Sequence, residues 1–191
     1  MKSIIIALMA SYFSAAAELP EGYEIVHVPV YADGTSINPD GTLDIADTTE
    51  RAAYKKLPSL KRSCAKGSAA ACFETATILQ NESFTWIKDL PASIPYLQKA
   101  CSKNHIDSCL LLTVSYFNGT GTSQNYHEAL RISRKLCSRK IAEGCFNTAI
   151  SYENGYGVRQ DTIEAWEYFG KSCDYGYQSG CDNYTRMNKT R

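Results

Sequence analysis

Motifs that hold metals or cofactors are scarce in this sequence. The chain has three histidines, and none of its eight cysteines forms a Cys-x-x-Cys pair. Zinc sites and dithiol redox centres need such residues at short spacings, so no metal and no cofactor are expected. Lysine-arginine runs and basic-aromatic platforms are also absent, which argues against a nucleic-acid partner.

Long apolar runs are missing as well. No segment approaches eighteen consecutive apolar residues, so no membrane-spanning helix is expected. Residues 1–17, MKSIIIALMASYFSAAA, combine one lysine, a short apolar run and three small residues at the end. This pattern is typical of a secretory signal peptide, so we expect an exported protein that begins near Glu18.

Residues 18–50 carry eight acidic side chains and no Lys or Arg, whereas residues 51–191 carry nineteen basic and twelve acidic ones. The acidic segment alternates apolar and other residues and ends in Asp-Gly and Pro-Asp-Gly turns, which predicts an extended arm or a small β structure. The basic surplus that follows fits either an ordinary solvated surface or a surface that attracts acidic polymers of the cell envelope.

The cysteines form a regular series. They stand eight residues apart within each pair, and successive pairs begin 37, 36 and 36 residues after one another: Cys64 and Cys72, Cys101 and Cys109, Cys137 and Cys145, Cys173 and Cys181. A period of this size predicts a stacked-repeat architecture. An even number of cysteines behind a signal peptide predicts disulfides.

Geometry favours a disulfide inside each pair. One continuous helix would separate residues eight apart by roughly 12 Å, beyond the roughly 7 Å that a disulfide spans between Cα atoms, so the chain must turn back within each pair. Equivalent cysteines of neighbouring repeats would lie at least roughly 9 Å apart. The predicted disulfides therefore join Cys64 to Cys72, Cys101 to Cys109, Cys137 to Cys145 and Cys173 to Cys181.

Each repeat predicts two helices. The second cysteine of a pair opens a helix with apolar residues every three to four positions, which ends at Asn118-Gly119. Another helix starts at Asn125, and Glu128 three residues later completes the form of a capping box. The next repeat has the same pattern, with Asn154-Gly155, Asp161 and Glu164.

The combination of Cys-x7-Cys, Ala-Glu-Gly-Cys, Tyr-x-x-Gly-x-Gly and Glu-Ala-x-x-Tyr resembles Sel1-like repeats. A disulfide in every unit is similar to the cysteine-rich Sel1-like proteins of Helicobacter. The resemblance covers residues 64–181. It implies an all-α fold, an α/α superhelical solenoid of TPR-related hairpins with a disulfide in each unit. It also implies a Gram-negative cell that exports the protein to its periplasm or secretes it.

We expect three parts: a signal peptide at residues 1–17, an acidic arm at 18–50 and a repeat domain of about four units at 51–191. Residues 51–63 should supply the opening helix, and the last unit should end in a helix from Asp182 to about Met187. The first unit departs from the pattern, because residues 81–84 replace the glycine turn and Pro95 falls in its second helix. That unit should be irregular or kinked.

In such a solenoid the first helices of successive units line the concave face. The residues two and six positions after the second cysteine should point into that groove together: Glu74, Ile78, Leu111, Ser115, Asn147, Ser151 and Asn183. The predicted function is a monomeric scaffold that binds a peptide or protein segment there. The alternative is that these are only solvated helix positions.

The Helicobacter relatives imply a different function, a penicillin-binding protein with weak β-lactamase activity. Ser63-Cys64-Ala65-Lys66 matches Ser-x-x-Lys and Ser36-Ile37-Asn38 matches Ser-x-Asn, but no Lys-Thr-Gly is present. Repeat arrays seldom bring a nucleophile, an acid and a base together, so we expect no catalytic residues and prefer the scaffold.

Overall fold

The computed structural model describes residues 3–6, 23–26, 36–37, 43–44, 48–84 and 87–189. The chain divides into two units, residues 1–56 and 57–191. In the first unit β1 (Ser3–Ile6) pairs in parallel with β2 (Tyr23–Val26), and β3 (Ser36–Ile37) pairs antiparallel with β4 (Leu43–Asp44). The expected signal peptide and acidic arm lie largely outside the described residues and stay predictions.

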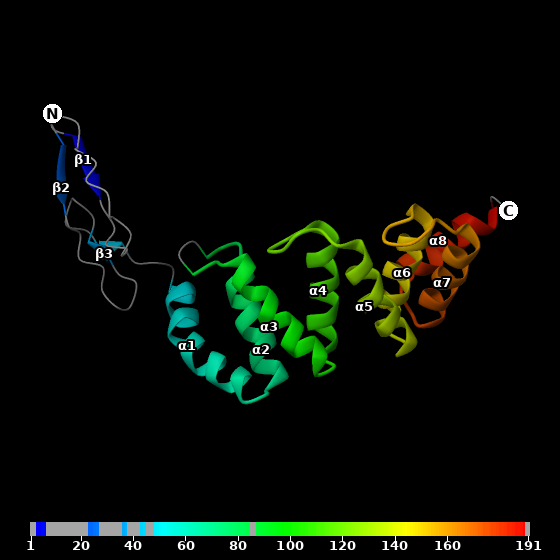
Figure 1. Cartoon of the computed structure of the whole chain (residues 1–191), viewed down its shortest axis with the longest axis horizontal. Coiled ribbons are helices and arrows are strands. Elements are labelled where there is room, and N and C mark those ends of the chain that lie inside the picture. Colours follow the sequence, from blue (N-terminus) through cyan, green and yellow to red (C-terminus); the bar gives the residue numbers. More distant parts are fainter. Residues whose placement is uncertain are drawn as a thin grey trace. The chain divides into compact units, whose positions relative to one another are not determined.

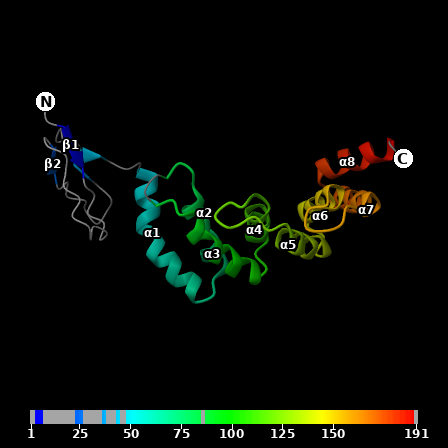
Figure 2. The same cartoon turned by 45° about the horizontal axis from the view of Figure 1, so that its top comes forward.

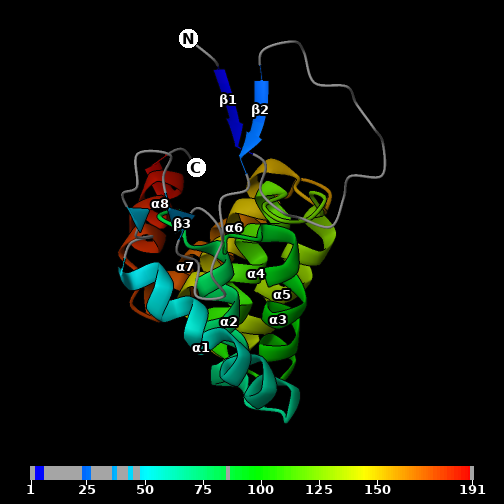
Figure 3. The same ribbon diagram turned by 90° about the vertical axis from the view of Figure 1, so that its left-hand side faces the viewer.

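From residue 48 onward the described part of the chain is helical. Its helices are α1 (Thr48–Ala65), α2 (Ala69–Gln80), α3 (Leu90–Ser102), α4 (Ile106–Asn118), α5 (Tyr126–Ser138), α6 (Ala142–Asn154), α7 (Thr162–Asp174) and α8 (Gln178–Lys189). From α2 on, each helix packs against the next, and the hairpins follow one another in chain order (Figure 1 and Figure 2). In Figure 3 the helices α2 to α8 overlap one behind another. This is the stacked-repeat architecture that the cysteine period predicts, in the α/α solenoid form that the resemblance implies.

A disulfide closes the turn inside every hairpin. The four bonds join the cysteines paired above, with Cα–Cα distances of 4.6, 4.7, 4.4 and 4.4 Å. The second cysteine does not open its helix, however: Cys109 is the fourth residue of α4 and Cys145 is the fourth of α6. The helices begin earlier because the turn is already complete, and the His105 ring accepts the Ser108 N–H as an N-cap.

The longer loops, which join α4 to α5 and α6 to α7, agree in part with the predicted caps. α4 and α6 end at Gly119 and Gly155, both left-handed with φ of 75°. Asn125 caps α5 by accepting the Glu128 N–H at 3.1 Å. The reciprocal half of the capping box is absent here, because the Asn125 N–H donates to the carbonyl of Tyr116 at 2.7 Å. The cap therefore ties the start of α5 to the end of α4.

The first unit is irregular where the sequence departs from the repeat. α2 ends at Asn81 in extended backbone (φ −65°, ψ 118°) instead of a left-handed glycine. α3 nevertheless runs without interruption from Leu90 to Ser102, with Pro95 inside it and Asp89 as its N-cap. Pro95 lies in the second turn of the helix, so it removes one backbone hydrogen bond without ending the element.

The core lies between the layers of helices. Leu97, Leu112, Leu136 and Phe169 are almost fully buried, together with the cysteines of the first three disulfides. Close packing between units also depends on small residues: a Cβ at Gly157 would lie 2.5 Å from the backbone of Tyr126 in the preceding unit. Neighbouring units therefore touch through backbone as well as through side chains.

Candidate binding face

A hollow of about 370 Å³ lies between α4, α5 and α6. Apolar side chains dominate its walls, and the half-buried Asn147 borders the same space. The full lining is Thr113, Val114, Phe117, Asn118, Ala129, Ser133, Phe146, Asn147, Ile150 and Ser151. Val114 is 46% exposed, an unusual position for an aliphatic side chain in the middle of a helix.

A second hollow, of about 490 Å³, continues on the same side of the array. It is lined by Phe73 of α2, by Asp107, Leu110, Leu111 and Val114 of α4, by Glu143 and Asn147 of α6, and by Tyr177. Val114 and Asn147 line both hollows. The two hollows therefore form one surface across the first helices of three units, which we call the first-helix face.

An aromatic cluster fixes one end of this face. The ring of Phe117 meets Tyr126 and Tyr156 edge-on, with centroid distances of 5.1 Å to each, and the two tyrosine rings stack at 4.8 Å. These rings come from α4, from the start of α5 and from the glycine loop after α6. They hold Phe117 at the wall of the first hollow and couple three successive elements.

The predicted groove residues fall into two groups. Leu111, Asn147 and Ser151 line the hollows, but the hydroxyl of Ser151 donates to its own helix at the carbonyl of Asn147. Ser115 and Ser151 are only 2% and 3% exposed, so their hydroxyls are not presented at the surface.

The other predicted residues contribute little to the face. Glu74 and Ile78 are half-buried and line neither hollow. Asn183 is held on its own helix, where its amide donates to the carbonyl of Ser179 at 2.8 Å. Five lining residues were not predicted: Phe73, Leu110, Val114, Phe117 and Ile150. The signal was the recurrence of apolar residues one, five and eight positions after the second cysteine, with Phe117 at position eight.

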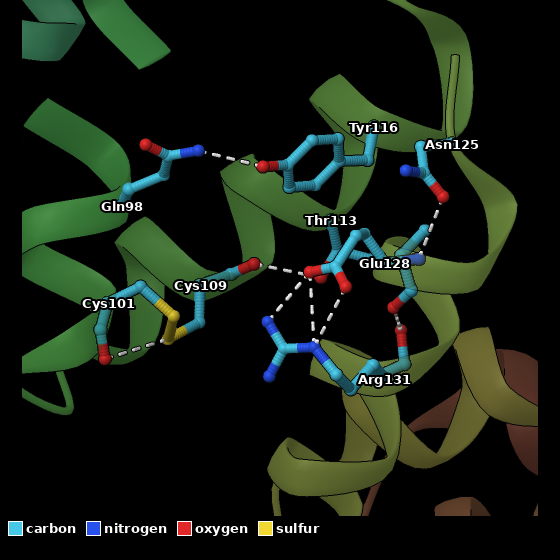
Figure 4. Close-up of polar contacts among 10 residues, drawn as sticks. Gln98, Cys101, Cys109, Thr113, Tyr116, Asn125, Glu128 and Arg131 are labelled. Atoms are coloured by element: carbon cyan, nitrogen blue, oxygen red, sulfur yellow. Dashed lines mark hydrogen bonds and ion pairs between the residues drawn. A yellow bond between two sulfur atoms is a disulfide. The ribbon is translucent and has the colours of Figure 1, made fainter. Parts of the chain in front are cut away.

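A third hollow, of about 380 Å³, lies between α3, α4 and α5 and is polar. Its groups already bond one another (Figure 4): Gln98 donates to the hydroxyl of Tyr116 at 2.8 Å, and Arg131 forms an ion pair with Glu128 at 2.8 Å. The hydrogen bonds from Arg131 lower the pKa of the Glu128 carboxyl below its ordinary value and outweigh burial, which opposes the shift. The polar groups named here therefore bond to one another and form a contact between units.

Of the two candidate catalytic motifs, Ser36-Ile37-Asn38 extends outside the described residues, and Ser63-Cys64-Ala65-Lys66 begins in the last turn of α1. Ser63 is half-buried in the last turn of α1, Lys66 is exposed in the disulfide turn, and neither lines any of the hollows above. Within the described residues no group of His, Cys, Asp and Glu side chains is arranged to hold a metal ion. The described helices likewise include none long and apolar enough to cross a membrane.

Helical hairpins that are linked by disulfides and stacked with α2, α4 and α6 on a common face define an α/α solenoid of the TPR-related class. The Sel1 repeat model matches residues 69–105, 107–140 and 142–177, more than half of the chain. The chain therefore belongs to the Sel1 repeat family, as a cysteine-rich member whose disulfides link the three matched units to one another and to α1 and α8 on either side.

Solved structures agree with this assignment. A protective antigen of uropathogenic Escherichia coli with an SLR fold is 26% identical, with a TM-score of 0.58, over 65% of this chain and 26% of that one. The chain thus spans about a quarter of that protein. A Sel1 repeat protein of Oxalobacter formigenes (23% identity, TM-score 0.57, 63% and 91% covered) and Helicobacter pylori cysteine-rich protein B (22%, 0.53, 71% and 97%) share the fold. No curated protein matches the chain significantly.

Proposed function

We propose that this chain is an exported repeat scaffold that binds an extended segment of a partner protein along the first-helix face. The observation that carries the proposal is the sharing of Val114 and Asn147 by two adjoining hollows. Together these hollows offer a continuous, mostly apolar track across α2, α4 and α6. Sel1 repeats serve protein interaction in general, and this track is where a partner segment fits best.

The track has the chemistry that an extended peptide needs. Val114, Phe117 and Ile150 can receive apolar side chains of the ligand. The Asn147 side chain is half-buried and has no hydrogen-bond partner among the described residues. Its amide can both donate to and accept from a peptide backbone, which would otherwise lose its hydrogen bonds with water on binding.

The disulfides support both the binding and the location. They fix the turn beside each first helix, so little conformational entropy is lost when the face engages a ligand. Disulfides persist in oxidising compartments such as the periplasm or the outside of the cell. The expected signal peptide at residues 1–17 agrees with that location.

Site-specific crosslinking tests the proposal. A photoreactive residue at Val114 should crosslink one envelope protein through a defined segment, and the same residue at Ile163 should not. Ile163 is a matched control because it is 57% exposed on α7 and lines neither hollow. Equal crosslinking from both positions would count against the first-helix face.

Binding measurements with the crosslinked segment as a synthetic peptide complete the test. Val114→Asp places a carboxylate in the apolar track, so the peptide should bind about tenfold or more weakly, equivalent to about 1.4 kcal/mol. Ile163→Asp should leave the affinity within about twofold, because binding energy is concentrated at the buried centre of an interface. An affinity that Val114→Asp does not change would refute the assignment.

A further inference from the structure

A row of cations follows the disulfide turns, at residues that line neither hollow of the first-helix face. In the first three cysteine pairs, the residues two positions before and two positions after the first cysteine are both basic. In the fourth pair only the residue before it is basic. The residues at these positions are Arg62 and Lys66, Lys99 and Lys103, Lys135 and Arg139, and Lys171 and Tyr175. Lys61 and Lys140 add to the row. Basic residues therefore recur at the same place in every unit.

The fold brings these turns to one edge. In Figure 1 the turns between α1 and α2, α3 and α4, and α5 and α6 lie along the lower side of the helices, and the longer loops lie along the upper side. Contacts link consecutive turns: the ammonium of Lys99 donates to the carbonyl of Ala65 at 3.2 Å, and the hydroxyl of Ser172 donates to the carbonyl of Ala142 at 2.9 Å. Ser102 and Lys135 line one hollow together.

Most of the positive charges in this row are not paired with a described carboxylate. Lys66, Lys103, Lys135, Arg139 and Lys140 are exposed, and none of them has an ion pair in the described part of the chain. In the row only Lys171 faces a described carboxylate, that of Glu167 at 4.0 Å. Neighbouring turns are separated by roughly one helix-packing distance of 8–10 Å, so a linear anion that lies along this edge meets cations from successive turns.

The carboxylates near this edge form no ion pair with Lys103, Arg139 or Lys140 among the described residues. Asp107 and Glu143 stand in the first turns of α4 and α6 and line the hollow on the first-helix face. Asp174 lies in the fourth turn, where the row is weakest. Attraction to the helix dipole accounts for a basic residue in the last turn, such as Lys99 and Lys135, but not for Lys140 beyond the end of α5.

We propose that this edge binds a linear anionic polysaccharide. Among the turn residues beside the cations, the exposed amide of Asn104 can donate to a sugar carboxylate. The hydroxyls of Ser102 and Ser138 donate to the carbonyls of Lys99 and Lys135 and can still accept from a sugar hydroxyl. Residues 61–68, 99–104 and 135–140 contain no aromatic residue, so these turns offer no platform for stacking nucleic-acid bases. The same three turns also offer no large exposed apolar side chain of the kind that inserts into lipid.

Binding of the full oxidised chain to heparin, with dextran as the neutral polysaccharide, tests this proposal. Lys103→Gln, Arg139→Gln and Lys140→Gln in one variant should weaken heparin binding by about tenfold or more and reduce its salt dependence, because fewer counterions are released. The control variant replaces Lys88, Arg159 and Lys189 with Gln. These three are exposed cations outside the disulfide turns, so both variants lose the same net charge.

The control variant should bind heparin within about twofold of the parent chain, since its cations lie outside the row. An equal loss in both variants would overturn the proposal, because net charge alone would then explain the binding. Tighter binding to phosphatidylglycerol vesicles or to a single-stranded oligonucleotide than to heparin at the same salt would overturn it too. Val114→Asp should not affect heparin binding, so this proposal and the peptide groove fail separately.

Discussion

Two glycines in the loop between α6 and α7 allow two contributions to the free energy of unfolding to be measured separately. One is the close contact between units, and the other is the backbone strain in the turn. Gly155 and Gly157 both have positive φ, 75° and 69°. A Cβ at Gly155 would meet Gln160 at 3.5 Å, which is ordinary contact, whereas a Cβ at Gly157 would lie 2.5 Å from the backbone of Tyr126. The two alanine variants therefore share the strain and differ in the collision with the preceding unit.

The expected magnitudes follow from these distances. Left-handed backbone costs an alanine about 1–2 kcal/mol, offset by about 0.4–1 kcal/mol because alanine has less entropy to lose than glycine on folding. Gly155→Ala should therefore destabilise the protein by about 1 kcal/mol. The collision at Gly157 is with backbone atoms, which cannot move aside as a side chain can, and overpacking of this kind adds about 1–3 kcal/mol. Gly157→Ala should thus cost about 2–4 kcal/mol.

Chemical denaturation of the oxidised protein, followed by far-ultraviolet circular dichroism, gives both free energies of unfolding. The disulfides must stay intact in both variants, since a lost bond would add its own effect. If Gly155→Ala and Gly157→Ala proved equally destabilising, the close approach of Gly157 to Tyr126 would not limit the packing of units, and the reasoning would be wrong.

Three further outcomes are expected. Replacing Cys137 and Cys145 together with Ser should lower the free energy of unfolding by about 2–3 kcal/mol, because a short loop is released; an unchanged denaturation midpoint would contradict this. Nitrocefin should not be hydrolysed by the chain, since Ser63 lies outside the hollows described above, and turnover abolished by Ser63→Ala would disprove that. The lowered pKa of Glu128 means that its ion pair stabilises the protein above the ordinary carboxyl pKa and loses that effect as pH falls through the folded pKa. Because 64% of the Arg131 and 37% of the Glu128 side chain are exposed, Glu128→Gln should change the stability difference between neutral and acid pH by no more than about 0.5 kcal/mol, as thermal melts at the two pH values would show.

The local features of the fold could be predicted because they depend on short spacings. The eight-residue interval between cysteines, the left-handed Gly119 and Gly155, and the caps at Asn125 and Asp161 each involve a few neighbouring residues. Features that join distant parts of the chain were missed. The Asn125 N–H bonds to Tyr116 instead of to the glutamate of its own helix, because the preceding helix end lies closer.

The second glycine of each loop shows the same limit. Gly121 and Gly157 are turn residues, as the sequence indicates, with φ of 73° and 69°. Their stronger constraint comes from the neighbouring unit, since a Cβ at Gly121 would lie 2.5 Å from the carbonyl oxygen of Leu90. Nothing in the spacing of the loop reveals which atom of another unit will approach it.

The predicted groove residues and the residues that line the hollows overlap only in part, and helix geometry explains the difference. At roughly 100° per residue, positions one, five and eight after the second cysteine lie within about 60° of one another, on the side away from the cysteine. In α4 these are Leu110, Val114 and Phe117, which line the hollows. Around the helix axis, position six lies about 240° from the cysteine. It is next to position three, which lies at about 300° and is buried. Ser115 and Ser151 occupy position six and are buried, so the hollows present mainly apolar side chains.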